Sequence, residues 1–132
     1  MTCSKYRKQT DFNQELAYES RELFPDWAVT ICFYTALHLV EHYACERSVD
    51  IGTYSQRSRH EARKLYVRDL ARDINNRNLS KVYEELEKES KKSRYLESLD
   101  INARDYYKQS QHKSKVTKAF QNLQIITGLL SN

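Results

Sequence analysis

The chain has 132 residues and a formal net charge of +4, which suits one domain rather than two. Only two glycines and one proline occur, so few positions can form the tight turns that sandwiches and barrels need every dozen residues or so. Leucine, isoleucine, valine and phenylalanine together make up about 22% of the chain, just above the roughly 20% below which disorder is expected. Ten tyrosines add apolar area to this small core. The composition therefore predicts an all-α fold with a thin, tyrosine-rich core.

The first half of the chain has the spacing of two helices. The first is expected over about residues 5–24, and Pro25 then ends it and starts the next. The apolar side of this first helix is marked by Phe12, Leu16 and Leu23. The second helix, over about residues 27–46, carries apolar residues on two sides. It is therefore predicted to be the central, buried helix.

The second half of the chain predicts three more helices. Ser58 and Glu61 form a capping box at the start of the third. The fourth is expected over about residues 79–97, and Asp100 or Asn102 can cap a fifth that runs to about residue 130. The end of this last helix has no charged residue, so it is either buried or an interface. The whole chain, residues 1–132, is thus expected to form one helical domain.

The charge and cysteine content of the chain indicate which cellular compartment and which binding partners to expect. The positive excess lies in residues 101–132, which hold five basic side chains and one acidic side chain. Such a mild field can attract phosphates but is not by itself typical of nucleic-acid binding. The three cysteines, Cys3, Cys32 and Cys45, form no CxxC motif, which favours free thiols in a reducing compartment. No apolar run approaches membrane-spanning length, and no signal-peptide core is visible at the N-terminus. We therefore expect a cytoplasmic protein that does not contact a membrane.

The second helix contains the pattern HxxEH, formed by His38, Glu41 and His42. Two histidines four residues apart lie on one face of a helix, as a zinc site needs. Proteases with this pattern need a further carboxylate ligand and a larger fold. His38 also falls on a stripe with apolar residues, where a histidine bonded to a neighbouring side chain is the simpler interpretation. No other metal or cofactor motif is present, so neither is expected.

Polar residues interrupt the apolar stripes of three predicted helices. A buried arginine costs several kcal/mol unless it is paired, and Glu41 can pair one of those present. These inward polar groups indicate either a network that fixes helix register or a pocket for an anion or phosphate, to which an arginine fork is suited. The candidate pocket residues are His38, Glu41, His60, Arg63, Ser90 and Arg94.

The same positions support a family resemblance. The residues that carry it are Asp26-Trp27-Ala28-Val29, the segment Phe33-Tyr34-Thr35-Ala36-Leu37-His38-Leu39-Val40-Glu41, and His60, Arg63, Tyr83, Leu86, Ser90, Arg94 and Tyr95. This pattern resembles the HEPN domain, the higher eukaryotes and prokaryotes nucleotide-binding domain, over about residues 12–126. The resemblance implies an up-and-down bundle of four or five helices, commonly a homodimer. It also implies a prokaryotic defence setting, such as a CRISPR, toxin–antitoxin or anti-phage system, in which many members are metal-independent ribonucleases.

The family's ribonuclease motif, an arginine and a histidine separated by four to six residues, does not occur here. Arg104 and His112 come nearest, with seven residues between them. The first hypothesis is therefore a non-catalytic HEPN-like module that binds a protein partner, RNA or a nucleotide. In that hypothesis the central and last helices dock the partner. The alternative is a metal-independent endoribonuclease that uses Arg104 with His112, or His60 with Arg63 and Arg94.

A weaker third hypothesis assigns non-specific nucleic-acid binding to the basic stretch near the C-terminus. Binding of this kind is lost steeply as salt rises. The side chains expected to form that surface are Lys108, Lys113, Lys115 and Lys118. A twofold homodimer is the default oligomer for any of these hypotheses.

Overall fold

The computed structural model describes residues 2–131, which form six α-helices and two short 3-10 helices and contain no strand. The helices are α1 (Ser4–Ser20), α2 (Pro25–Glu46), α3 (Arg59–Asp73), α4 (Asn78–Tyr95), α5 (Ala103–Lys108) and α6 (Lys113–Leu130), with η1 (Ile51–Tyr54) before α3 and η2 (Ser110–His112) before α6. The predicted all-α bundle is confirmed. None of the helices in the described part of the chain is both long and apolar enough to cross a bilayer.

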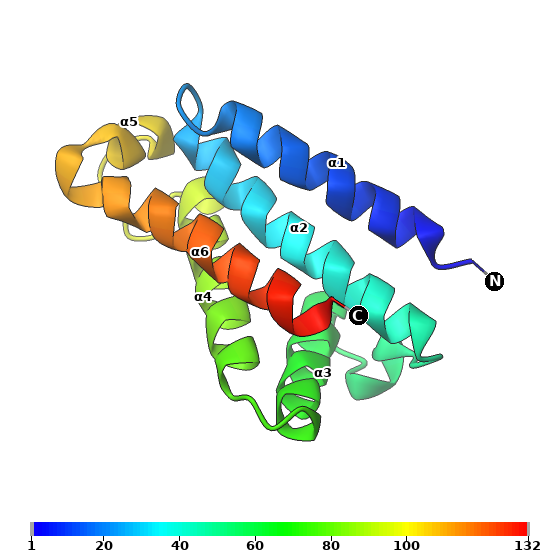
Figure 1. Cartoon of the computed structure of the whole chain (residues 1–132). Helices are drawn as coiled ribbons and strands as arrows, with labels where there is room; N and C mark the ends of the chain where they lie inside the picture. The colour runs from blue at the N-terminus through cyan, green and yellow to red at the C-terminus, as the bar shows by residue number, and fades with distance from the viewer. Residues whose placement is uncertain (1, 132) are drawn as a thin grey trace.

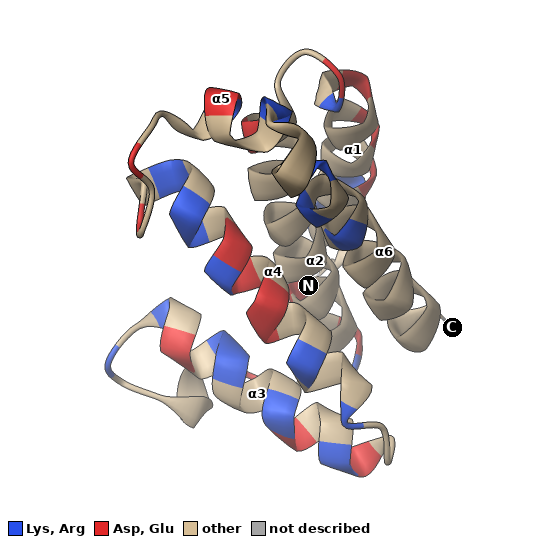
Figure 2. Ribbon diagram, turned by 90° about the vertical axis from the view of Figure 1, so that its left-hand side faces the viewer, with Lys and Arg blue, Asp and Glu red and all other residues tan. Residues whose placement is uncertain are grey.

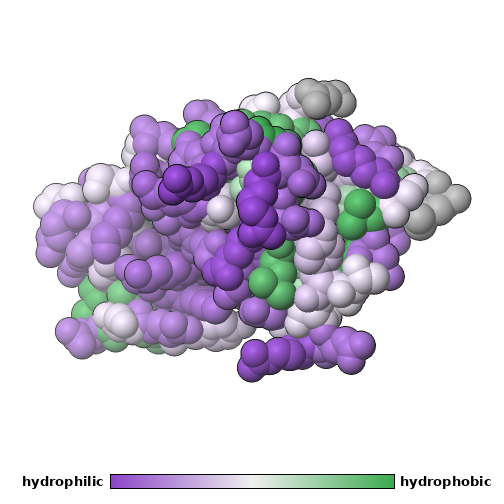
Figure 3. Space-filling view, turned by 90° about the horizontal axis from the view of Figure 1, so that it is seen from below, coloured by the Kyte–Doolittle hydropathy of each residue, from purple (hydrophilic) through white to green (hydrophobic). Residues whose placement is uncertain are grey.

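Helix α2 occupies the centre of the bundle, as its two apolar sides predict. Fourteen of its 22 residues are buried, because α1, α4 and α6 all pack against it. Helix α1 runs antiparallel to α2, α6 runs alongside α2, and α3 lies at one end of the molecule (Figure 1). The face seen from below in Figure 3 is mostly hydrophilic, with hydrophobic residues in small separate patches.

The predicted inner face of α1 is wrong. Phe12, Leu16 and Leu23 are exposed, and the residues of α1 that are buried are Thr10 and Ala17. These two lie roughly a third of a turn round the helix from the larger apolar residues, at 100° per residue. Their small side chains allow α1 to approach α2 closely. Three large apolar side chains of α1 and the following loop are therefore left facing solvent.

The predicted fifth helix is divided into α5, η2 and α6. Asn102 caps α5 by accepting a hydrogen bond from the Asp105 N–H at 2.9 Å, as one of the two predicted caps. Gln109 then takes an extended conformation, with φ −65° and ψ 139°, and ends the helix. The break allows Tyr107 to be buried and redirects α6 along α2 and α4. Six apolar residues of α6 are buried there and so do not face a partner: Val116, Ala119, Phe120, Leu123, Ile126 and Leu130.

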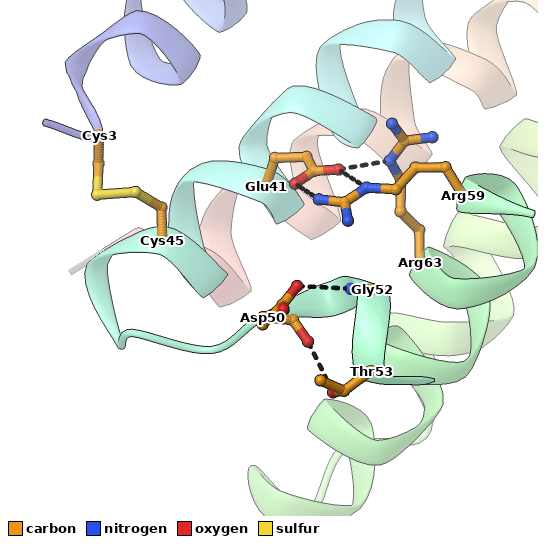
Figure 4. A network of polar contacts seen from close by, with 8 residues as sticks. All are labelled: Cys3, Glu41, Cys45, Asp50, Gly52, Thr53, Arg59 and Arg63. Carbon is orange, nitrogen blue, oxygen red and sulfur yellow. Dashed lines mark hydrogen bonds and ion pairs between the residues drawn. A yellow bond between two sulfur atoms is a disulfide. The ribbon is translucent and has the colours of Figure 1, made fainter. Parts of the chain in front are cut away.

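A disulfide joins Cys3, at the start of α1, to Cys45, in the last turn of α2 (Figure 4). The antiparallel pairing of the two helices brings these distant cysteines together. The expectation of three free thiols is therefore wrong for two of them, and the argument for a reducing compartment loses its basis. Cys32 is free, and its burial in the core raises the pKa of its thiol to about 12.

Candidate functional site

A buried carboxylate on α2 pairs with two arginines on α3 (Figure 4). Arg59 donates from Nε and Nη2 to the two oxygens of Glu41, at 3.0 and 2.7 Å. Arg63 donates from Nε to Oε2 of the same carboxylate at 2.7 Å. Ser58 caps α3, since its Oγ accepts from the Glu61 N–H at 3.0 Å, and this cap sets the start of the helix at Arg59. The cap and the spacing of four residues place both arginines opposite Glu41.

These hydrogen bonds decide the charge state of Glu41. Burial disfavours its ionised form, but the hydrogen bonds and charges of Arg59 and Arg63 outweigh burial and lower the pKa of the carboxyl below its usual value. The sequence predicted that Glu41 pairs one arginine, and the structure shows Arg63 in this role. The sequence analysis did not predict that Arg59 also pairs with Glu41. The spacing of four residues between Arg59 and Arg63 indicates that both lie on one face of the helix.

The two predicted pocket histidines lie beside this ion pair. Burial and the charge of Arg63 lower the pKa of both His38 and His60, so both imidazoles are neutral at pH 7. His38 is half-buried, and no hydrogen-bond partner of its Nδ1 is found in the described part of the chain. His60 is exposed, and its ring stacks on Phe33 with 6.5 Å between centroids.

Arg94 is held near the C-terminal end of α4 by hydroxyl groups. Its guanidinium donates to the hydroxyls of Tyr34 at 2.8 Å, Tyr95 at 3.2 Å and Ser90 at 3.2 Å. It also lies over the rings of Tyr34 and Tyr95, at 5.4 and 4.8 Å from their centroids. Within residues 2–131 no carboxylate lies within ion-pair distance of Arg94, so its charge is fixed in place but not neutralised.

Two aromatic side chains are exposed where the end of α4 meets the start of α2. Tyr95 is 64% exposed and Trp27 is 58% exposed. Trp27 and Tyr34 are seven residues apart on α2 and so lie on one face of the helix. Ser93 donates to the Asp26 carbonyl at 2.6 Å, which holds this end of α4 against the start of α2. We call Trp27, Tyr34, Ser90, Arg94 and Tyr95 the Arg94 site.

The six predicted pocket residues are thus brought to one region, but they do not enclose a single pocket. His60 and Arg94 both approach the ring of Phe33, whereas Glu41 is engaged by the arginines of α3. A cavity of about 400 Å³ beside Glu41 is walled by Tyr6, Asp50 and Arg59. Neither Arg94 nor His60 lines it. The predicted pocket is therefore an ion-pair network next to an open surface site.

Arg104 and His112 have separate surroundings. Arg104 donates to the Leu23 carbonyl at 3.0 Å and lies over the ring of Phe24. His112 stacks on Tyr106, with 3.9 Å between centroids, and the break at Gln109 puts it on a different element from Arg104. Among residues 2–131 no hydrogen bond joins the two side chains, and each is engaged with other groups.

The basic residues near the C-terminus lie on two surfaces. Lys115 and Lys118 line a groove between α4 and α6, and Lys108 and Lys113 line a cavity next to Arg21. Basic residues are concentrated in the first turns of α6, whereas acidic and basic residues alternate along α4 (Figure 2). The four lysines predicted to bind nucleic acid are thus shared equally between these two pockets.

The HxxEH pattern does not gather a set of metal ligands. Glu41 is held by the two arginines, and His42 lies 3.8 Å from Glu46. Among residues 2–131, no group of three or more histidine, cysteine, aspartate or glutamate side chains is placed to hold a metal ion.

Comparison with known proteins gives no relative: no protein-family model, no curated protein and no solved structure matches this chain.

Proposed function

We propose that this protein is a non-catalytic, HEPN-like helical module that binds single-stranded RNA or a nucleotide at the Arg94 site. The proposal depends on the guanidinium of Arg94, which is held in one position, is not neutralised by a carboxylate within residues 2–131, and belongs to a site with exposed aromatic rings. Single-stranded nucleic acids are recognised by this combination, in which bases stack on aromatic rings and phosphates pair with arginine. The HEPN likeness, a homodimer and the prokaryotic defence setting belong to the same proposal and depend on the resemblance of the residues quoted above.

The Arg94 site has the parts that such a ligand needs. Tyr95 and Trp27 offer exposed ring faces for stacking. The charge of Arg94 is available to pair with a phosphate, because its present partners are three hydroxyls and one carbonyl, all of them neutral. The adjacent neutral imidazole of His60 can donate or accept one hydrogen bond without adding charge.

Replacing Arg94 by glutamine is expected to weaken RNA binding about tenfold, or by ~1.4 kcal/mol. The substitution removes one phosphate contact and the cation next to the stacked bases. Fluorescence anisotropy with a labelled single-stranded ten-nucleotide RNA in EDTA measures the change. Arg77→Gln is the matched control, since it removes the same charge just before the opposite end of α4 and should alter the Kd less than twofold. Equal affinities of Arg94→Gln and the unaltered protein would contradict the proposal.

A metal-independent endoribonuclease is the second candidate, and one observation favours it. His60 is a neutral base, and both it and Arg94 lie against Phe33. RNA cleavage needs a base near a 2′-hydroxyl and a cation for the developing charge. We expect labelled RNA to stay intact during incubation with the protein in EDTA. Cleavage that disappears in both His60→Ala and Arg94→Gln would instead establish the enzyme.

A further inference from the structure

A second candidate site lies on the other side of α4, in the groove between α4 and α6. It has a volume of about 660 Å³, within the range of small-molecule sites. Its apolar floor includes the buried Leu86 and Ala119. At 100° per residue, the groove-lining Glu85 and Lys92 lie roughly opposite Arg94 on α4, so this groove is separate from the Arg94 site.

Asn122 is a buried polar residue in the wall of this groove, with only 3% of its surface exposed. Its Nδ2 donates to Oε2 of Glu85 at 3.1 Å. Because a carboxylate only accepts, this bond fixes the orientation of the amide and leaves Oδ1 as the free atom. Asn122 Oδ1 has no hydrogen-bond partner among residues 2–131, and a buried unpaired acceptor costs about 1–3 kcal/mol. A ligand that donates a hydrogen bond in the groove would remove this cost.

The rim of the groove is positively charged. Four lysines and two glutamates line it, which leaves a formal excess of two positive charges: Lys88, Lys92, Lys115, Lys118, Glu85 and Glu89. Lys92 pairs with Glu89 at 3.7 Å, and Lys115 donates to the hydroxyl of Tyr106. Lys88 and Lys118 are exposed and have no acidic partner among the described residues. The excess matches the charge of about −1.5 to −2 on a phosphomonoester at pH 7.

We propose that this groove binds a sugar phosphate. The hydroxyls of the sugar donate to Asn122 Oδ1 and to the carboxylate of Glu85, and the phosphate is held by Lys88 and Lys118. A simple anion would satisfy the lysines and leave Asn122 unpaired. A neutral sugar would satisfy Asn122 and leave the lysines without a counter-charge. The pairing of an orphaned acceptor with a cationic rim therefore selects a ligand that carries both groups.

Isothermal titration calorimetry with three matched probes tests the assignment: ribose 5-phosphate, ribose and inorganic phosphate. Ribose 5-phosphate is expected to bind at least tenfold more tightly than either of the others. Asn122→Leu, which is close to isosteric, should raise the Kd for ribose 5-phosphate about tenfold, because the donor then meets no acceptor. Lys118→Gln should raise it about threefold.

Lys8→Gln on α1 is the control. It changes the net charge by the same amount as Lys118→Gln but lies far from the groove, so it should leave the Kd unchanged. Circular dichroism checks the fold of each variant, and Asn122→Ser replaces Asn122→Leu if the leucine variant does not fold. The assignment is overturned if ribose 5-phosphate binds no more tightly than inorganic phosphate. It is also overturned if a folded Asn122 variant binds ribose 5-phosphate as the unaltered protein does.

Discussion

Removal of the Cys3–Cys45 disulfide, by Cys3→Ser with Cys45→Ser, is expected to lower the free energy of unfolding by about 4 kcal/mol. The bond joins residues 42 apart in the sequence, and closing a loop of this length restricts the unfolded chain by about that amount. Helix α1 depends on the bond more than the other long helices, because only Thr10 and Ala17 of its residues are buried. Urea unfolding followed by circular dichroism measures the difference.

A reducing agent supplies the control for this prediction. Dithiothreitol should lower the stability of the unaltered protein to that of the double variant and should leave the double variant unchanged. If dithiothreitol leaves the unaltered protein equally stable, the bond does not contribute as argued.

Glu41→Gln is expected to destabilise the fold by about 2–3 kcal/mol at pH 7. Breaking a buried ion pair costs about 3–5 kcal/mol, and the value is reduced here because Arg59 is 44% exposed and can turn towards water. Glutamine keeps the shape of the side chain but removes the charge that faces Arg59 and Arg63. Unfolding curves of both proteins at pH 7 provide the comparison.

Glu84→Gln is the matched control for this substitution. Glu84 also accepts two hydrogen bonds from an arginine, Arg68, but the side chains of this pair are 33% and 46% exposed. An exposed pair of this kind contributes about 0–1 kcal/mol. A loss in Glu84→Gln as large as that in Glu41→Gln would show that burial is not the cause.

The pH dependence of the Glu41 effect follows from its lowered pKa. Glu41 stays ionised to a lower pH in the folded state than in the unfolded state. Its contribution to the free energy of unfolding is therefore complete above the usual glutamic acid pKa of 4.5 and is lost as the pH falls below that value. The difference in stability between the unaltered protein and Glu41→Gln should therefore shrink between pH 5 and pH 3. His38 and His60 further lower the stability of the folded state below about pH 6.5, because both bind protons more readily when the chain is unfolded.

Periodicity and capping account for the parts of this fold that the sequence predicted. The central position of α2 follows from its two apolar sides, and the start of α3 follows from Ser58 and Glu61. The packing side of α1 was not predictable in the same way, because close approach at Ala17 outweighed the larger apolar area of Phe12 and Leu16. The break at Gln109 depends on where Tyr107 and α6 pack, which local spacing does not encode.

The residues of the candidate sites also divide into those that the sequence identified and those that it did not. Arg63, Ser90 and Arg94 were identified because they are polar residues on apolar stripes, and Glu41 was identified as a carboxylate that could pair with one of these arginines. Asn122 was missed, although it lies one position before Leu123 on the buried side of α6 and was open to the same argument. The disulfide was missed because it depends on the antiparallel pairing of α1 and α2, and that pairing is a tertiary feature.

The exposed position of Trp27 gives the protein an intrinsic optical reporter. It is the only tryptophan in the chain, so its fluorescence comes from a single place, the start of α2, which does not line the groove between α4 and α6. A base that stacks on Trp27 would quench this emission, whereas a sugar phosphate in the groove would leave it unchanged. Unlabelled ligands can therefore be assigned to one site or the other by their effect on tryptophan emission.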